Sequence, residues 1–302
     1  MVKQRTIKSE VSISGVGLHT GQNGVLTFRP AEANHGIKFR RIDVDGQPLI
    51  YARVENVVDT SRGTTIEQNG VKVYTVEHIL ASLKGSDIDN VLIDINCEEP
   101  PILDGSAKIM MEKLRNVGSV EQNAEREFYV VKKKIVYYHP KVGCELTIEP
   151  AEKFTIDVKV DYKSQVLNVQ EAHLESFDDF EEEIAPCRTF VFFQELEMLL
   201  QHNLIKGGDL SNAIVFIEKY VPEEELRHVA KLFNIDSIGV YDGGILNNTS
   251  LYFENEPARH KLLDLVGDMT LLGKPILGKV TAYKPGHFAN TEFVKLILKN
   301  LK

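Results

Sequence analysis

The sequence predicts an α+β fold made of two domains that pack on each other, with helices covering the sheets. Residues 1–60 alternate apolar with polar side chains and are broken by glycine and proline, which favours short antiparallel strands, and helical patterns follow them. After the polar stretch 119–126 the same order, strands first and helices later, begins again. At 302 residues, 43% of them hydrophobic, the chain is long enough for two such domains.

The elements of the N-terminal half follow from local patterns. Strands are expected around 11–13, 24–28, 36–39 and 90–95. The segment 75–85 predicts a short helix, with Thr75 as its N-cap and Gly85 just past its end. A second helix is expected from Ala107 onward, ending near Gly118.

The stretch 119–126 contains few apolar residues and is the best candidate for a linker, so we expect an N-terminal domain at 1–122 and a C-terminal domain at 123–302. The C-terminal domain is expected to hold strands at 129–138, 145–149, 155–160 and 278–283, and helices near 193–201, 222–233 and 256–272. An apolar insert is expected in it near 188–217.

Composition argues against several functional classes. Forty-four acidic residues against 35 basic ones give a net charge of -9, which opposes binding to nucleic acid or to an anionic membrane surface. The 3 cysteines show no CxxC spacing, which argues against a disulfide framework and a thiolate zinc site. No stretch approaches the ~18 apolar residues that a transmembrane segment requires, so we expect a cytoplasmic protein.

One stripe of a predicted helix carries three ionisable side chains. His260, Asp264 and Asp268 stand at i, i+4 and i+8, while apolar residues occupy the other faces. Burying such a stripe costs free energy unless its charge is compensated, and a divalent metal would compensate it. Imidazole and carboxylate one turn apart suit zinc or ferrous iron. For an isolated pair of this kind, an exposed contact worth about a few tenths of a kcal/mol is the commoner alternative.

Two further segments strengthen the metal hypothesis. Glu77 and His78 place a carboxylate beside a third candidate ligand at the start of a helix, and His287 follows the strand 278–283 in a turn. Taken singly, an N-terminal Glu or a lone His is ordinarily a solvated or structural side chain. Taken together, they predict that His78 joins the helix pair as a ligand, with Glu77 and His287 beside the ion and a fourth position open to water.

Several long motifs are spread over nearly the whole chain. They are Lys3-Gln-Arg-Thr6, Ser14-Gly-Val-Gly-Leu-His-Thr-Gly21, Thr75-Val-Glu-His78, Asp89-Asn90, Pro101-Ile-Leu-Asp-Gly-Ser-Ala107, Cys187-Arg-Thr-Phe190, Lys206-Gly-Gly208, Asn212-Ala-Ile-Val215, the His260 helix and Gly286-His287. In these motifs the chain resembles the zinc-dependent UDP-3-O-acyl-N-acetylglucosamine deacetylases of lipid A biosynthesis. The resemblance implies two similar α+β domains with helical layers sandwiched between two outer sheets.

The resemblance also implies a role for each candidate residue. The implied set is zinc ligands His78, His260 and Asp264, general base Glu77, general acid His287, oxyanion-stabilising Thr189, Asp268 orienting the protonated His287, and substrate contacts Lys261, Phe190, Gly208 and Leu18. Where some members carry a cysteine near the metal, this chain has Gly63, so any role of that thiol is absent.

Apolar side chains are dense in residues 188–201. They motivate the hypothesis of a passage for an acyl chain, and they are Phe190, Phe192, Phe193, Leu196, Met198, Leu199 and Leu200. From the sequence alone, a buried strand and helix in the core is the commoner explanation of such density. The resemblance implies the passage, with Met198 and Leu199 as contacts.

The expected reaction is zinc-dependent hydrolysis of the N-acetyl group of UDP-linked acylated N-acetylglucosamine, giving UDP-3-O-acyl-glucosamine and acetate. The acyl chain of this substrate suggests transient membrane proximity. The stretch 219–255 resembles the form that some lineages fuse to a 3-hydroxyacyl-carrier-protein dehydratase, so a fused or adjacent dehydratase module is an expected partner. A zinc hydrolase of another N-acyl sugar, or a structural-zinc interaction module with four protein ligands, remains an alternative.

Overall fold

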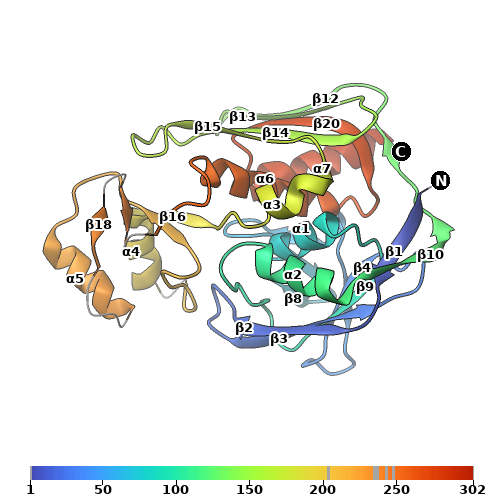
Figure 1. Ribbon diagram of the computed structural model, residues 1–302, viewed down its shortest axis with the longest axis horizontal. Coiled ribbons are helices and arrows are strands. Elements are labelled where there is room, and N and C mark those ends of the chain that lie inside the picture. Colours follow the sequence, from blue (N-terminus) through green and yellow to red (C-terminus); the bar gives the residue numbers. More distant parts are fainter. Residues whose placement is uncertain (1, 203–204, 234–237, 242–243, 247–248, 302) are drawn as a thin grey trace.

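Two sheets form the outer layers of the protein, and helices fill the space between them (Figure 1). The computed structural model describes residues 2–202, 205–233, 238–241, 244–246 and 249–301. The first sheet has the order β2 (Val11–Val16), β3 (Asn23–Pro30), β9 (Val91–Ile95), β4 (Ile37–Arg41) and β5 (Leu49–Tyr51). The second has the order β12 (Ile135–His139), β13 (Cys144–Glu149), β20 (Ile276–Tyr283), β14 (Phe154–Asp161) and β15 (Val169–Leu174), with β11 (Tyr129–Val130) also paired to β20.

The two sheets share one topology. In each, the last strand of the sheet lies in the middle, antiparallel to the second strand and parallel to the third. The remaining neighbours, β2 with β3, β4 with β5, β12 with β13 and β14 with β15, are all antiparallel. The predicted α+β fold with two similar halves is therefore confirmed, although the halves share no obvious sequence identity.

The inner layers are helical. They contain α1 (Glu77–Gly85), α2 (Lys108–Val117), α6 (Glu256–Thr270) and α7 (His287–Leu301). Helix α6 is buried on nearly every side, because it packs against α1, α7 and strands β14 and β15 of the second sheet. The two helices approach closely at Gly267, where an added Cβ would lie 2.1 Å from the carbonyl oxygen of Glu77. This glycine therefore sets the spacing between α1 and α6.

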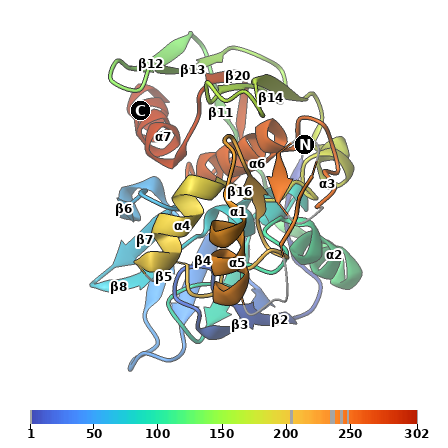
Figure 2. The same ribbon diagram turned by 90° about the vertical axis from the view of Figure 1, so that its left-hand side faces the viewer.

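A smaller lobe projects from this layered body (Figures 1 and 2). It contains β16 (Phe190–Phe192), α4 (Phe193–Gln201), β17 (Ile214–Phe216), α5 (Glu223–Leu232), β18 (Val240–Tyr241) and β19 (Ile245–Leu246). Its interior is a separate apolar cluster that includes Phe193, Leu196 and Val229. The expected insert at 188–217 thus begins this lobe, which continues through β19.

The shorter elements complete the chain. They are β1 (Lys3–Ile7), a 3-10 turn at Val54–Asn56, β6 (Val57–Asp59), β7 (Thr65–Gln68), β8 (Val71–Val73), β10 (Ser119–Glu125), a 3-10 turn at Phe177–Asp179 and α3 (Phe180–Glu183). None of the helices in the described ranges is both long and apolar enough to cross a membrane.

Several sequence expectations about individual elements were wrong. The stretch expected to be a linker forms β10, which pairs antiparallel with β1, so its polar side chains belong to a two-stranded ribbon. Thr75 is not the N-cap of α1: it has a φ of 50°, Val76 takes the cap position, and the Thr75 hydroxyl donates to Glu99 instead. Gly85 is the last residue of α1 rather than the residue after it. The domain limits at 122/123 stay a prediction.

Two more differences concern the C-terminal half. The strand expected at 129–138 is divided into β11 and β12, which pair with different neighbours, β20 and β13. His287, expected in a turn, is the first residue of α7. Pro285 and Gly286 are typical turn residues and led to the expectation of a turn at His287. The residues that follow have helical spacing, in which Phe293 and Ile297 are buried four residues apart.

Candidate metal centre

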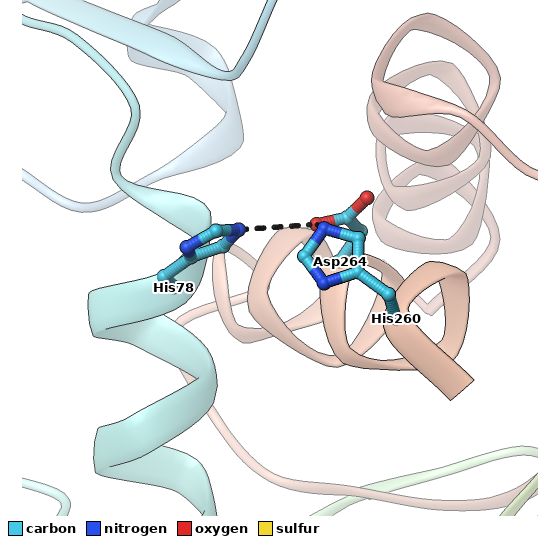
Figure 3. Close-up of side chains that lie close together, drawn as sticks. All are labelled: His78, His260 and Asp264. Carbon is cyan, nitrogen blue, oxygen red and sulfur yellow. Dashed lines mark ion pairs between the residues drawn. The ribbon is translucent and has the colours of Figure 1, made fainter. Parts of the chain in front are cut away.

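Three buried side chains from α1 and α6 converge between the two halves (Figure 3). His78 is the second residue of α1, and His260 and Asp264 lie one turn apart on α6. Oδ1 of Asp264 lies 3.6 Å from Nε2 of His78 and 3.4 Å from Nε2 of His260. One potential ligand atom from each residue lies within 4.8 Å of the others, so the group could hold one metal ion.

The protonation of His260 suits it to ligation. Burial lowers its pKa to about 3, and the negative charge of Asp264 only partly opposes this, so the ring is neutral at pH 7. Its Nδ1 lies 3.0 Å from the carbonyl oxygen of Cys187. That contact places the ring proton on Nδ1 and leaves the lone pair of Nε2 directed at Asp264.

Asp264 is ionised, and one of its oxygens is unsatisfied. Burial by itself would raise its pKa, but the positive charges of Lys261 and His287 hold the pKa well below its usual value. Lys261 donates to Oδ2 at 2.8 Å, whereas Oδ1 is buried without a hydrogen-bond partner among the described residues. A carboxylate oxygen that faces two imidazole nitrogens and has no donor is the arrangement that a divalent cation would satisfy.

Glu77 lies beside this group at the start of α1. It is buried, the amide of Thr64 donates to its Oε2 at 2.8 Å, and its Oε1 lies 3.8 Å from Nε2 of His287. Burial raises the pKa of Glu77, although the neighbouring positive charge of His287 opposes that rise. One oxygen of the carboxylate is thus held by the backbone, and the other faces the space near the ligands.

His287 lies close to both Glu77 and Asp264 and is held by Asp268. Its Nδ1 lies 3.0 Å from Oδ2 of Asp268, and its Nε2 lies 3.9 Å from Asp264. Burial opposes a charged ring, but the negative charges of Asp268, Glu77 and Asp264 raise its pKa to about 10. His287 is therefore protonated at pH 7, beside a carboxylate base.

Asp268 is itself fixed by residues that the sequence did not single out. The hydroxyl of Thr64 and the side-chain amide of Asn290 both donate to its carboxylate, in addition to His287. Thr64 follows Gly63, where an added Cβ would lie 2.8 Å from Oε1 of Glu77. The absent cysteine side chain would therefore have stood against Glu77. A threonine beside a glycine gives no sequence signal that its hydroxyl holds the carboxylate of Asp268.

Lys261 and Phe190 border the metal group. The ammonium of Lys261 lies 5.7 Å from the centroid of the Phe190 ring, and that ring lies 6.4 Å from the His260 ring. Thr189 precedes Phe190; its amide donates to Gly105 of the first half at 2.8 Å, and its carbonyl accepts from Ile214. A buried ion pair between Arg188 and Glu256, the first residue of α6, anchors this segment.

The other predicted substrate contacts lie in two places. The amide of Gly207 donates to the carbonyl of Leu18 at 3.0 Å, which brings Leu18 to the turn that contains Gly208. Met198 is 50% exposed and Leu199 half-buried on α4 in the lobe, whereas the side chain of Leu200 lies outside the described residues. Phe193 and Leu196 are buried in the lobe's own core. For these two residues, core packing therefore explains the apolar density of the segment.

Comparison with known proteins identifies close relatives over the whole chain. The family described as UDP-3-O-acyl N-acetylglycosamine deacetylase matches residues 4–233 and 234–299. "Bifunctional enzyme LpxC/FabZ" of Bacteroides thetaiotaomicron is 45% identical over 302 residues, and that of Porphyromonas gingivalis is 43% identical. The match covers 100% of this chain but 66% and 65% of those relatives. "UDP-3-O-acyl-N-acetylglucosamine deacetylase" of Myxococcus xanthus is 38% identical over 98% of this chain and 87% of its own length.

Proposed function

The chain belongs to the UDP-3-O-acyl-N-acetylglucosamine deacetylase family, and from this premise we propose what its buried centre does. It hydrolyses the N-acetyl group of UDP-3-O-acyl-N-acetylglucosamine to give UDP-3-O-acyl-glucosamine and acetate, the committed step of lipid A biosynthesis. The observation that carries this proposal is the arrangement of Glu77 and a protonated His287 beside a group of three potential ligands. A base, an acid and an open ligand position are the parts that amide hydrolysis requires.

The proposed metal is Zn²⁺, held by His78, His260 and Asp264. Two imidazole nitrogens and one carboxylate oxygen form a ligand set typical of catalytic zinc, and ferrous iron is the alternative occupant. When bound, the ion supplies Lewis acidity, which polarises the acetamide carbonyl and lowers the pKa of a water molecule. The unsatisfied Oδ1 of Asp264 supports a cation at this position.

The protein's own groups move the protons in the proposed mechanism. Glu77 accepts a proton from the attacking water through Oε1, because Oε2 is already held by the amide of Thr64. His287 then donates from Nε2 to the departing amine, because its Nδ1 is held by Asp268. Burial favours the protonated, neutral form of Glu77 and therefore strengthens it as a base at neutral pH.

The remaining residues are proposed to orient the substrate. The hydroxyl of Thr189 stabilises the oxyanion of the tetrahedral intermediate together with protonated His287. Lys261 and Phe190 contact the substrate beside the metal, and Leu18 and Gly208 contact it from the adjoining turns. Met198 and Leu199 on α4 contact the acyl chain. A cytoplasmic location, transient membrane proximity and a dehydratase partner remain predictions of the sequence.

One experiment tests substrate, reaction and metal together. Acetate release from UDP-3-O-acyl-N-acetylglucosamine is measured before chelation, after chelation, and after Zn²⁺ or Fe²⁺ is added back. We expect activity to disappear with the chelator and to return with the metal. Metal content that stays constant while no acetate is released from this substrate or from other N-acyl sugars would instead favour a structural metal. Release from another N-acyl sugar alone would change the substrate but keep the reaction.

A further inference from the structure

A pocket lies where the two halves of the chain meet, apart from the metal centre, and we call it the junction pocket. It encloses about 250 Å³, and its lining includes Arg53 and Lys84 from the first half and Phe154, Met269 and Ile276 from the second. Gln4 of β1 also lines it, so it lies at the end of the molecule opposite the lobe (Figure 1). None of the ligand, base or acid residues of the metal centre lines it.

The charges that line the junction pocket do not cancel. Its cations are Arg53, Lys84, Arg126 and Lys274, and its acidic groups are Asp87, Asp89 and Glu127. Arg126 pairs with Asp87 at 2.7 Å and Asp89 at 2.6 Å, and Lys274 pairs with Glu127. Within the described part of the chain, no ion pair involves Arg53 or Lys84. The lining therefore carries one more positive than negative charge.

Lys84 stands out because its ammonium lies among aromatic rings. It lies 4.9 Å from the centroid of Phe177 and 6.0 Å from that of Phe154, and no hydrogen-bond acceptor for it is found in the described ranges. Burial lowers the pKa of Lys84 and the nearby charge of Arg126 acts in the same direction, although the negative charges of Asp87 and Asp89 oppose this. Contact with ring faces replaces only part of the hydration that an ammonium loses on burial.

Arg53 is held at the wall of the junction pocket by the second half of the protein. Its Nη1 donates to the carbonyl of Leu272 at 3.1 Å. The guanidinium also lies directly over Gly273, where an added Cβ would fall 1.4 Å from Nη1. A planar cation in a fixed position is pre-organised to bind a carboxylate, because little side-chain entropy remains to be lost.

We propose that the junction pocket binds a small organic monoanion, a carboxylate with a compact apolar body. The carboxylate would pair with Lys84 and Arg53, for which the described residues provide no ion pair. The body would rest against Phe154, Met269 and Ile276, which keeps its apolar surface out of water. The single excess positive charge favours a monoanion over a phosphate ester of higher charge. This inference does not depend on the proposed deacetylase reaction.

Such a ligand would contact both halves at once. It would reach the C-terminal end of α1 through Lys84 and the C-terminal end of α6 through Met269. Because α1 and α6 also carry the metal group, occupancy should stabilise the pair of halves against separation. Binding to the folded state alone raises thermal stability in proportion to the logarithm of ligand concentration.

The test uses the metal-loaded full chain and 4-bromobenzoate as the probe. Calorimetric titration compares wild type with Lys84→Met, Lys84→Arg and the control Lys113→Met, an exposed lysine on α2. We expect Lys84→Met to weaken binding at least about tenfold, the loss of one charge-assisted contact, while the other two proteins stay close to wild type. The neutral analogue 4-bromobenzamide should bind more weakly to wild type.

The bromine atom locates the probe independently of the variants. Crystals soaked with 4-bromobenzoate should show an anomalous bromine peak between Phe154 and Ile276. A peak only at the metal centre would overturn the proposal, because carboxylates also bind metals. So would equal affinity of Lys84→Met and wild type, or equal binding of the amide. If Lys84→Met does not fold, the crystal and the comparison of 4-bromobenzoate with 4-bromobenzamide on wild type still decide.

Discussion

Nδ1 of His287, the first residue of α7, lies 3.0 Å from Oδ2 of Asp268, near the end of α6. The same carboxylate accepts hydrogen bonds from Thr64 and Asn290, so it is held from three directions. With Nδ1 fixed in this way, the imidazole can turn only its Nε2 toward Glu77 and Asp264. The direction in which the ring can deliver a proton is thus decided by Asp268.

Asp268→Asn should move the alkaline limb of the pH profile to lower pH. In the proposed mechanism the protonated form of His287 is the active one. Its pKa is raised to about 10, and activity should therefore fall as pH rises through that value. Removing the negative charge of Asp268 lowers this pKa. A bound cation lowers the pKa of His287 in wild type and in Asp268→Asn alike. The measurement is therefore the difference between the alkaline limbs of the two kcat/KM profiles. An unchanged alkaline limb, with an Asp157→Asn control on β14 behaving as wild type, would refute the assignment.

Asp264→Ala should lose both the metal and stability. It removes one of the three proposed ligands and leaves the largely buried ammonium of Lys261 without its carboxylate, which costs about 3–5 kcal/mol in the metal-free protein. Bound metal is measured by mass spectrometry and the free energy of unfolding by urea titration. Adding Lys261→Met should restore part of the stability but no metal. If the double variant is no more stable than Asp264→Ala, the buried charge is not the cause.

Glu77→Gln should keep the metal and lose turnover. The amide preserves the size of the side chain and can still accept from Thr64, but it cannot take a proton. The loss of a general base corresponds to about 10²–10⁴ in kcat. Acetate release and metal content are measured on the same preparation. A variant that binds metal and keeps near-normal turnover would assign the base to another residue.

Gly267→Ala should disturb the centre without touching any of its functional groups. The new Cβ would lie 2.1 Å from the carbonyl oxygen of Glu77, so α1 must shift away from α6. Overpacking of this kind costs about 1–3 kcal/mol and should weaken metal affinity, because His78 moves with α1. Urea titration and competition with a chelator measure the two effects. Thr270→Ala on the same helix is the control, and equal behaviour of both variants would exclude the close approach.

Met198→Glu together with Leu199→Glu should reduce the preference for long acyl chains. A carboxylate on this face of α4 would have to be desolvated against the chain, which disfavours binding. The ratio of kcat/KM for long-chain and short-chain substrates gives the readout, because a general loss of activity leaves that ratio unchanged. Gln194→Glu adds a carboxylate at an exposed position of the same helix and is the control for added charge. A constant ratio in the double variant would place the acyl chain elsewhere.

The sequence predicted the residues of the centre better than the elements that hold them. His260 and Asp264 could be paired because helical periodicity places residues i and i+4 on one face. That α1 brings His78 to them depends on packing across Gly267, about which periodicity says nothing. His78 was grouped with the other two because Glu77 and His78 place a carboxylate beside a third candidate ligand, and the resemblance to known proteins implies the same set.

Errors arose where side chains bond across long distances. Thr75 has the residue type of a helix N-cap, but its hydroxyl donates a hydrogen bond to buried Glu99, 24 residues away. The polar residues of β10 looked like a linker because the partner strand β1 lies more than a hundred residues earlier. Thr64 was missed for the same reason: its hydroxyl bonds to Asp268 on a distant helix. Such partners cannot be read from neighbours in the chain.

The central position of β20 has a consequence for how the protein is synthesised. The first sheet has all of its strands once residue 95 has left the ribosome, whereas the second lacks its middle strand until residues 276–283 emerge. Until then, β13 and β14 have no strand between them, and their unpaired edges can join other chains. Slow emergence of residues 276–283 should therefore favour aggregation of nascent chains.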